Sequence, residues 1–184
     1  MRDETIKPNR RSIRLPEYDY RQPGAYFVTI CTRNRECLLG EIVEGKIVPN
    51  ESGLIAQLVW NGLPLRFPHT TIDCFVVMPN HIHGIIVINV GAIHESPLLD
   101  EPPKSRRRKM LLSKMIGFLK MNTAKRINSF RRTPGTPVWQ HNYYEHVIRN
   151  EIDLEEIRQY IENNPFKWLE NENHPDKMKK GSSL

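Results

Sequence analysis

Two pairs of side chains in this sequence have types and spacings that could do chemistry. His81 and His83 bracket one isoleucine in MPNHIHGIIVI, and Tyr160 stands four residues before Asn164 in QYIENNP. Neutral imidazoles bind divalent metal ions, a carboxamide oxygen is a ligand for hard cations, and a tyrosine hydroxyl can act as a nucleophile. Whether these groups work together depends on the elements that carry them.

The histidine pair lies at the start of an apolar stretch that predicts a strand. Side chains alternate across a strand, so His81 and His83 point to one side of the sheet and Ile82 to the other. On an open sheet face, two neutral imidazoles could hold one divalent metal ion. The alternative is a pair of surface or hydrogen-bonded histidines, and a metal site would need a third ligand in any case.

The tyrosine and the asparagine lie on a predicted helix, where a spacing of four residues places both on one face. This pattern alone also fits a tyrosine at the edge of the core and an asparagine that ends the helix before Pro165, because an apolar stripe runs beside them (Leu154, Ile157 and Ile161). A tyrosine hydroxyl has a pKa of about 10 and is a poor nucleophile at neutral pH. Beside a metal-bound phosphodiester it could attack phosphorus and form a covalent phosphotyrosine.

Two other tyrosines compete for this role. Tyr143 and Tyr144 fall in a predicted strand, and neither has a carboxamide one helical turn away. Tyr160 therefore remains the candidate nucleophile. His141 and His146 could approach the site from the same strand, and no role is assigned to them.

Residue patterns predict the elements that must position these groups. Dense β-branched and aromatic stretches predict strands over 24–32, 70–79, 81–90 and 138–150, with short strand-like pieces between 33 and 50. Helical periodicity predicts helices over 50–63, 110–130 and 151–165, with Asn50 and Asp153 as N-caps and Glu155 and Glu156 in the first turn of the last helix.

The order of these elements predicts the fold class. Strand, helix, strand, strand, helix, strand is the split β-α-β pattern of an α+β, ferredoxin-like (RRM-like) fold with an antiparallel sheet. The last predicted helix is an addition to this pattern, and it carries Tyr160. Only Pro79 and Asn80 separate the second and third strands, so we expect a hairpin there.

Length and composition fit a single domain. The chain has 184 residues, of which 39% are hydrophobic. The sequence has no run of 18 apolar residues, so we expect no membrane span. The N-terminus lacks the apolar core of a secretory signal. The three cysteines form no C-x-x-C pair, and their odd number argues against a disulfide framework, so we expect a cytoplasmic protein. We expect a basic arm over 1–22, a single domain over 23–170 with a flexible loop over 90–109, and a polar tail over 171–184.

A net charge of +6 and clustered basic residues favour a polyanionic partner. Each cluster alone also fits a solvated loop. The candidates for DNA contact lie in the arm, in the loop and on the basic side of the helix at 110–130: Arg10, Arg11, Arg14, Arg106, Arg107, Arg108, Lys114, Lys120, Lys125 and Arg126. Most such contacts would position the DNA backbone without reading its sequence.

The motifs together resemble a known family. HIH on a strand matches the His-hydrophobic-His motif of HUH endonucleases, and YIENNP resembles the tyrosine helix of their single-tyrosine (IS200-like) transposase branch. RLPEYDYRQPGAYFVTICTRNR, VVMPNHIHGIIVI, LLSKMIGFLK and VWQHNYYEHVIRN are similar to the REP-associated tyrosine transposases within that branch. The likeness runs from Arg14 to Trp168.

The resemblance implies a catalytic domain in which His81, His83 and Asn164 bind Mg²⁺ or Mn²⁺ and Tyr160 is the nucleophile. It implies a metal-dependent single-stranded DNA endonuclease and strand-transfer enzyme that acts near DNA hairpins through a 5′-phosphotyrosine, in the cytoplasm of a prokaryote and associated with its nucleoid. The alternative is a non-catalytic hairpin-binding protein on the same scaffold. The short RNEID connection before the Tyr160 helix favours a monomer, with a homodimer as the alternative. The hairpin recognised, the cleavage position and the choice between integration and nicking stay open.

Overall fold

The computed structural model describes residues 23–89, 111–170 and 174–175. The predicted arm at 1–22, the loop at 90–109 and all of the tail at 171–184 except 174–175 lie outside these residues. So do six of the predicted DNA contacts: Arg10, Arg11, Arg14, Arg106, Arg107 and Arg108. No helix within the described ranges is both long enough and apolar enough to cross a membrane.

The central sheet has four strands in the order β4-β5-β1-β6, with β1 at Gly24–Cys31, β4 at Thr70–Met78, β5 at His81–Ile88 and β6 at Tyr144–Ile148. Each neighbouring pair is antiparallel. Helix α1 (Glu51–Asn61) precedes β4, and α4 (Leu111–Arg131) precedes β6. This arrangement confirms the α+β, ferredoxin-like fold class predicted from the order of elements.

The shorter elements extend this frame. Strands β2 (Gly40–Val43) and β3 (Lys46–Pro49) pair as a separate hairpin, as expected from the strand-like pieces after residue 33. Its turn places Glu44 at φ 51° and Gly45 at φ 74°, the left-handed region that Gly adopts without strain. Helix α2 (Leu63–Arg66) follows α1, and short 3₁₀ helices lie at Arg33–Arg35 (η1) and Trp168–Glu170 (η2).

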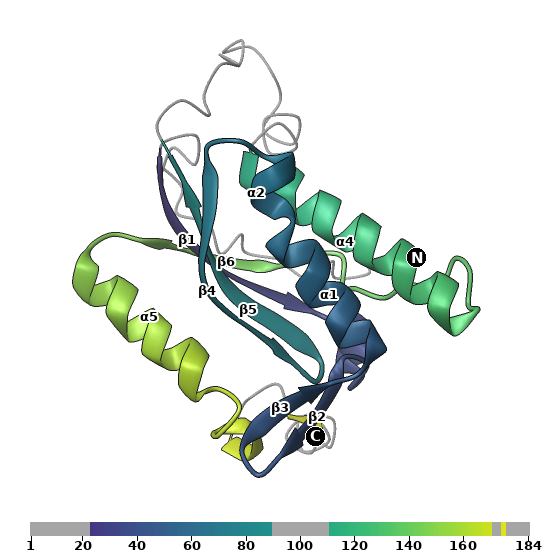
Figure 1. The fold of residues 1–184 in the computed structure, drawn as a ribbon. Coiled ribbons are helices and arrows are strands. Elements are labelled where there is room, and N and C mark those ends of the chain that lie inside the picture. The colour runs from purple at the N-terminus through teal and green to yellow at the C-terminus, as the bar shows by residue number, and fades with distance from the viewer. Residues whose placement is uncertain (1–22, 90–110, 171–173, 176–184) are drawn as a thin grey trace, which may run out of the picture.

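The two faces of the sheet are covered by different helices. Helices α1 and α4 lie on one face and α5 (Glu151–Asn163) lies on the other, as Figure 1 shows. Strand alternation sends Tyr26, Val28 and Ile30 of β1 into the large core under α1 and α4. Phe27, between them, joins Ile85, Ile148 and Ile161 in a smaller cluster under α5.

One glycine allows a close approach on the α1 face. Gly84 follows the histidine pair, and a Cβ built there would lie 2.3 Å from the indole ring of Trp60. That ring also stacks on Phe75 of the neighbouring strand, with ring centroids 5.5 Å apart. Residue 84 therefore lets α1 pack closely under the strand that carries His81 and His83.

Two features differ from the sequence prediction by more than two residues. The strand predicted over 138–150 is shorter, since β6 covers only Tyr144–Ile148. Before it, Trp139 forms an isolated bridge with Thr32, and the carbonyl groups of residues 140–142 accept hydrogen bonds from Lys120 Nζ. The predicted cap Asp153 is also wrong. Asn150 has extended backbone and caps α5 by accepting a hydrogen bond from the amide of Asp153, which places Glu151 and Asp153 in the first turn.

Candidate active site

The hairpin between β4 and β5 delivers the two histidines to the face covered by α5. Pro79 and Asn80 form its turn, as predicted from the sequence. His81 pairs with Cys31 of β1, and His83 pairs with Thr29. Both imidazoles are buried, at 0% and 2% exposure, so the open sheet face expected around them is in fact covered.

Hydrogen bonds fix the orientation of the first imidazole. The carboxamide nitrogen of Asn80 donates to the carbonyl of Arg35 at 3.0 Å, so its oxygen is the atom 2.7 Å from Nδ1 of His81. An amide oxygen only accepts, and Nδ1 of His81 must therefore carry the proton. The lone pair of His81 then lies on Nε2, the atom that can bind a metal ion.

The imidazole of His83 is held by the hydroxyl of Thr29, which can either donate or accept a hydrogen bond. Nδ1 of His83 lies 2.9 Å from the hydroxyl of Thr29, and its Nε2 lies 2.9 Å from Nε2 of His81. Since Nε2 of His81 accepts, Nε2 of His83 donates to it and the Thr29 hydroxyl donates to Nδ1 of His83. A hydroxyl can also accept, so Thr29 could equally support the other tautomer of His83, with both Nε2 lone pairs directed at one ion.

Burial keeps both rings neutral. Removal from water holds the pKa of His81 well below its usual range, with smaller contributions in the same direction from His83 and Arg35. Burial also lowers the pKa of His83 to about 3. Neutral imidazole is the metal-binding form, so no proton has to leave before an ion binds at neutral pH.

Helix α5 brings the candidate nucleophile to this pair. The hydroxyl of Tyr160 lies 3.4 Å from Nε2 of His83, while its ring packs edge-on against Phe27 with centroids 5.9 Å apart. Phe27 in turn stacks on His83 at 5.4 Å. Tyr160 is 46% exposed, so its side chain both contacts the buried histidine and reaches the surface.

Asn164 lies at the same point. It is the C-cap of α5, it is only 3% exposed, and its side chain hydrogen-bonds to His81, which favours the charged imidazole slightly. Trp168 of η2 packs next to His81 with ring centroids 6.0 Å apart. His81 and His83 from a strand and Asn164 from the end of a helix therefore lie together, with Trp168 packed beside them.

These three side chains fit a small divalent cation. Adjacent ligands at about 2.1 Å in octahedral geometry are about 3 Å apart, close to the 2.9 Å between the two Nε2 atoms. Within the described ranges, no group of three or more His, Cys, Asp and Glu side chains could hold a metal ion. A site with three protein ligands at this point therefore depends on the carboxamide of Asn164.

A pocket of about 670 Å³ opens beside the nucleophile. Its walls come from the end of α5 and the segment after it: Glu156, Tyr160, Asn163, Asn164, Lys167 and Glu170 are among the lining residues. The mixture of amides, one tyrosine and one lysine can hydrogen-bond a polar ligand. Glu156 and Glu170 are the acidic lining residues, and Lys167 is the basic one.

The basic residues predicted on the helix at 110–130 lie elsewhere. Lys114, Lys125 and Arg126 are exposed on α4, on the opposite face of the sheet from Tyr160. Lys120 is half-buried, donates to three backbone carbonyls at 2.9–3.3 Å, and lies over the ring of Tyr143. The structure brings the four catalytic candidates together and leaves these four cations apart from them.

Several residues at the site were missed by sequence reasoning. Asn80 was taken only as a turn residue and Thr29 only as part of a strand. Arg35 lies close enough to His81 for its charge to lower the pKa of that imidazole. Tyr144, set aside as a competing nucleophile, is 40% exposed on this face and contacts Phe27 edge-on. The sequence signal was alternation, which puts Thr29 and Phe27 on one face of β1.

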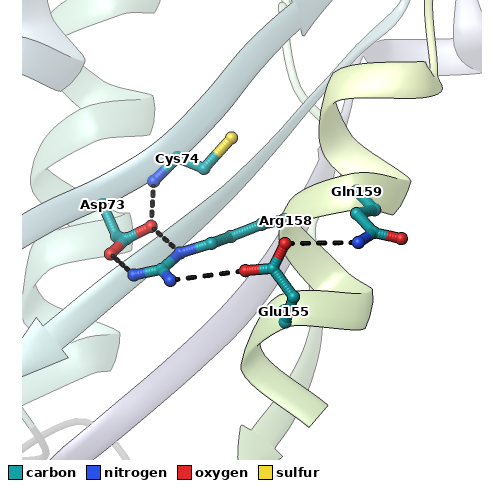
Figure 2. Close-up of polar contacts among 5 residues, drawn as sticks. All are labelled: Asp73, Cys74, Glu155, Arg158 and Gln159. Atoms are coloured by element: carbon teal, nitrogen blue, oxygen red, sulfur yellow. Dashed lines mark hydrogen bonds and ion pairs between the residues drawn. The ribbon is translucent and has the colours of Figure 1, made fainter. Parts of the chain in front are cut away.

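Helix α5 is tied to both edges of the sheet. Arg158 makes two hydrogen bonds to Asp73 of β4, at 2.9 and 2.7 Å, as Figure 2 shows. His146 of β6 lies 3.0 Å from Asp153 in the first turn of α5. An aspartate between apolar residues in the strand TTIDCFVVM was a sequence signal for such a partner.

The chain is similar in sequence to a known protein and in fold to two solved structures. No protein-family model matches the chain. A Haemophilus influenzae protein, described as an uncharacterized protein, is 38% identical over 170 residues, which cover 91% of this chain and 94% of that protein. A solved REP-associated tyrosine transposase bound to a REP hairpin is 24% identical, with a TM-score of 0.49 over 84% of this chain and 74% of that one. A Deinococcus radiodurans protein whose name proposes a transposase is 16% identical, with a TM-score of 0.45 over 82% and 95% of the two chains.

The fold and the site thus define an α+β protein in which a strand-borne histidine pair, a carboxamide and a helix-borne tyrosine converge. The chain belongs to the same family as the Haemophilus influenzae protein, which it matches over nearly its whole length.

Proposed function

We propose that this protein is a metal-dependent, single-stranded DNA endonuclease and strand-transfer enzyme of the single-tyrosine HUH type. The observation that supports this most directly is the position of the Tyr160 hydroxyl, 3.4 Å from the end of a buried histidine pair. A tyrosine at the edge of a core would need no such neighbours. Histidines that were merely hydrogen-bonded would not require a carboxamide from another element beside them.

In this proposal His81, His83 and Asn164 hold Mg²⁺ or Mn²⁺, and imidazole ligands suit Mn²⁺ somewhat better. When bound, the ion would polarise the scissile phosphate and stabilise its developing negative charge. Asn80 and Thr29 hold the two imidazoles in the orientation that presents Nε2. Phe27 packs against His83 and Tyr160, so the nucleophile and the ligands share one rigid support.

Tyr160 would attack phosphorus, and the bond from phosphorus to the 3′ oxygen would break. The products are a 5′-phosphotyrosine and a 3′-hydroxyl, so the proton lost by the tyrosine is balanced by the one gained by the leaving oxygen. Attack by a 3′-hydroxyl on the phosphotyrosine reverses the step and rejoins DNA. Because the four groups come from one chain, we propose a monomer with a complete site.

The proposed DNA path runs along the open side of Tyr160. Helix α5 carries five acidic residues and one basic residue, so its outer surface repels phosphate. Arg35 near His81 and Lys167 in the pocket are the cations placed to contact the backbone beside the scissile phosphate. Tyr144, exposed at the edge strand β6, offers a ring on which an unpaired base could stack.

A covalent-adduct assay tests the proposal. The protein is incubated with a labelled DNA hairpin that has single-stranded flanks, with Mn²⁺ or EDTA, and analysed on a denaturing gel. We expect a protein–DNA adduct that requires the metal and disappears in Tyr160→Phe but persists in Tyr143→Phe, the matched control. Tight hairpin binding without an adduct under any divalent metal would instead identify the non-catalytic binding protein.

A further inference from the structure

The position of α5 on the sheet is set by more than apolar packing. Ile161 is the only buried residue within the helix, while Leu154 and Ile157 are partly buried against the same cluster. Apolar attraction is non-directional. Such a narrow stripe holds the helix on the sheet but constrains its rotation about its own axis only weakly.

Besides the hydrogen bond of Asn164 to His81 at the end of the helix, two polar contacts constrain this rotation, one at each edge of the sheet. β4 and β6 are the edge strands of the described sheet. Asp153 meets His146 on β6, and five residues later Arg158 meets Asp73 on β4. The helix thus crosses the sheet with its first turn tied to one edge and its middle tied to the other.

A β-bulge presents Asp73 to the helix. Ile72 pairs with Ile86 and Phe75 with Gly84, so Asp73 and Cys74 together stand opposite one residue of β5. The bulge turns the Asp73 carboxylate toward α5, where one of its oxygens also accepts the amide of Cys74 at 2.7 Å. The Arg158 guanidinium holds the pKa of that carboxyl below its usual range.

The geometry of this pair fixes an angle as well as a distance. Two parallel N–H···O bonds form only when the planar guanidinium and the carboxylate face each other. Arg158 and Tyr160 are two residues apart, or about 200° around the helix axis, so they point to nearly opposite sides. Side-chain tips lie about 5–6 Å from the axis, so a rotation of about 10° would move the tyrosine hydroxyl by about 1 Å.

We propose that Arg158 and Asp73 are a positioning pair that sets the rotation of α5 and thereby the place of the Tyr160 hydroxyl beside His83. The pair touches neither substrate nor metal and acts through the helix. A misplacement of about 1 Å at a reacting atom can cost about 100-fold in rate. The expected effect on the reaction rate rests on the proposed nuclease function. The expected effect on the position of Tyr160 does not.

The test compares Arg158→Lys and Asp73→Asn, alone and combined, with Glu151→Gln as a matched control that removes an exposed charge from the same helix. Lysine keeps the charge but cannot form the two-bond contact. Under single-turnover conditions at saturating Mn²⁺ we expect adduct formation to slow about 10- to 100-fold, with DNA affinity within about threefold of the original. The double variant should be no slower than the more affected single one, because both remove one interaction.

A second measurement does not depend on activity. A 3-fluorotyrosine introduced at position 160 places fluorine beside the rings of Phe27 and His83. We expect its NMR resonance to move toward that of free fluorotyrosine in Arg158→Lys and Asp73→Asn and to stay in place in Glu151→Gln. Because Arg158→Lys and Asp73→Asn each remove the same contact from a different partner, the test stays valid if one of the two variants fails to fold.

The outcomes separate the two ideas. Absence of an adduct with the original protein would reject the proposed function, and the fluorine resonance would then decide the positioning role. Variants that lower only the melting temperature, with unchanged resonance and unchanged rate below that temperature, would overturn the positioning role and leave an ordinary ion pair.

Discussion

The hydroxyl of Thr29 lies 2.9 Å from Nδ1 of His83, across the antiparallel pair of β1 and β5. A hydrogen bond to the ring nitrogen that does not face the metal holds a metal-binding histidine in its orientation, and its loss costs about 10- to 100-fold in metal affinity. This relationship is direct because Thr29 and His83 occupy the same register position on adjacent strands.

Thr29→Val should therefore weaken Mn²⁺ binding by about 10- to 100-fold, because valine has nearly the same shape but no hydroxyl. The measurement is a Mn²⁺ titration followed by electron paramagnetic resonance. Thr29→Ser, which keeps the hydroxyl, is the matched control and should bind within about threefold of the original. A valine variant that binds as tightly as the serine variant would show that Thr29 does not orient the ring.

Gly84→Ala should destabilise the fold by about 1–3 kcal/mol, because the new methyl group would overlap the ring of Trp60. Gly117→Ala is the matched control. Gly117 lies within α4 with nothing within 4 Å of an added Cβ, so alanine there should stabilise by about 0.5–1 kcal/mol. Urea unfolding measures both, and equal effects of the two substitutions would refute the packing argument.

Acid should destabilise the metal-free protein through the histidine pair. The pKa of His83 is about 3 in the folded protein and about 6.5 in the unfolded chain, so the unfolded state binds the proton more tightly. The free energy of unfolding is then fully retained above about pH 6.5 and falls as the pH is lowered toward 3. By pH 5 the loss should reach about 1–2 kcal/mol.

Urea unfolding in EDTA at pH 7 and pH 5 measures this loss. His83→Gln removes one of the titrating groups and should show a smaller difference between the two pH values. The carboxyl of Asp73, whose pKa is also lowered, adds a loss in the same direction at lower pH. An identical pH dependence in His83→Gln would contradict the assignment of the loss to this imidazole.

Lys120 should support the fold more than it binds DNA. Burial lowers its pKa to about 8, and its ammonium group donates to the carbonyls of Gln140, His141 and Asn142. Lys120→Met leaves these acceptors without their donor and should lower the free energy of unfolding by about 1–3 kcal/mol. Lys125→Met, an exposed position on the same helix, should change it by less than about 0.5 kcal/mol. A stable Lys120→Met protein with greatly reduced DNA affinity would restore the phosphate-contact role.

Tyr144→Ala should weaken binding of the single-stranded flank by about 1–3 kcal/mol, the usual contribution of one stacked base. Fluorescence anisotropy with a flanked hairpin measures the affinity, and Tyr144→Phe should retain it because the ring remains. Phe130→Ala removes an aromatic ring that is even more exposed, from α4 on the other face, and serves as the control. Equal losses from Tyr144→Ala and Phe130→Ala would argue against a base-stacking position at β6.

The sequence alone determined the order of the elements and which of the candidate side chains share a face. Local patterns fixed them: alternation put His81 and His83 on one face, Asn50 and Pro79 marked a cap and a turn, and a spacing of four put Tyr160 and Asn164 on one helix face. These are short-range properties, each decided within a few residues. The structure confirms the elements, apart from the start of β6 and the cap of α5.

Only the tertiary structure decided how far those groups lie from one another and what supports them. The 3.4 Å between Tyr160 and His83 joins residues 77 positions apart in the sequence, and the pairing of Asp73 with Arg158 joins residues 85 positions apart. No local pattern encodes such contacts, because they depend on which strands become edges and on which face a helix packs. Lys120 shows the same limit: its charge predicted a surface contact, while packing turned it toward three backbone carbonyls.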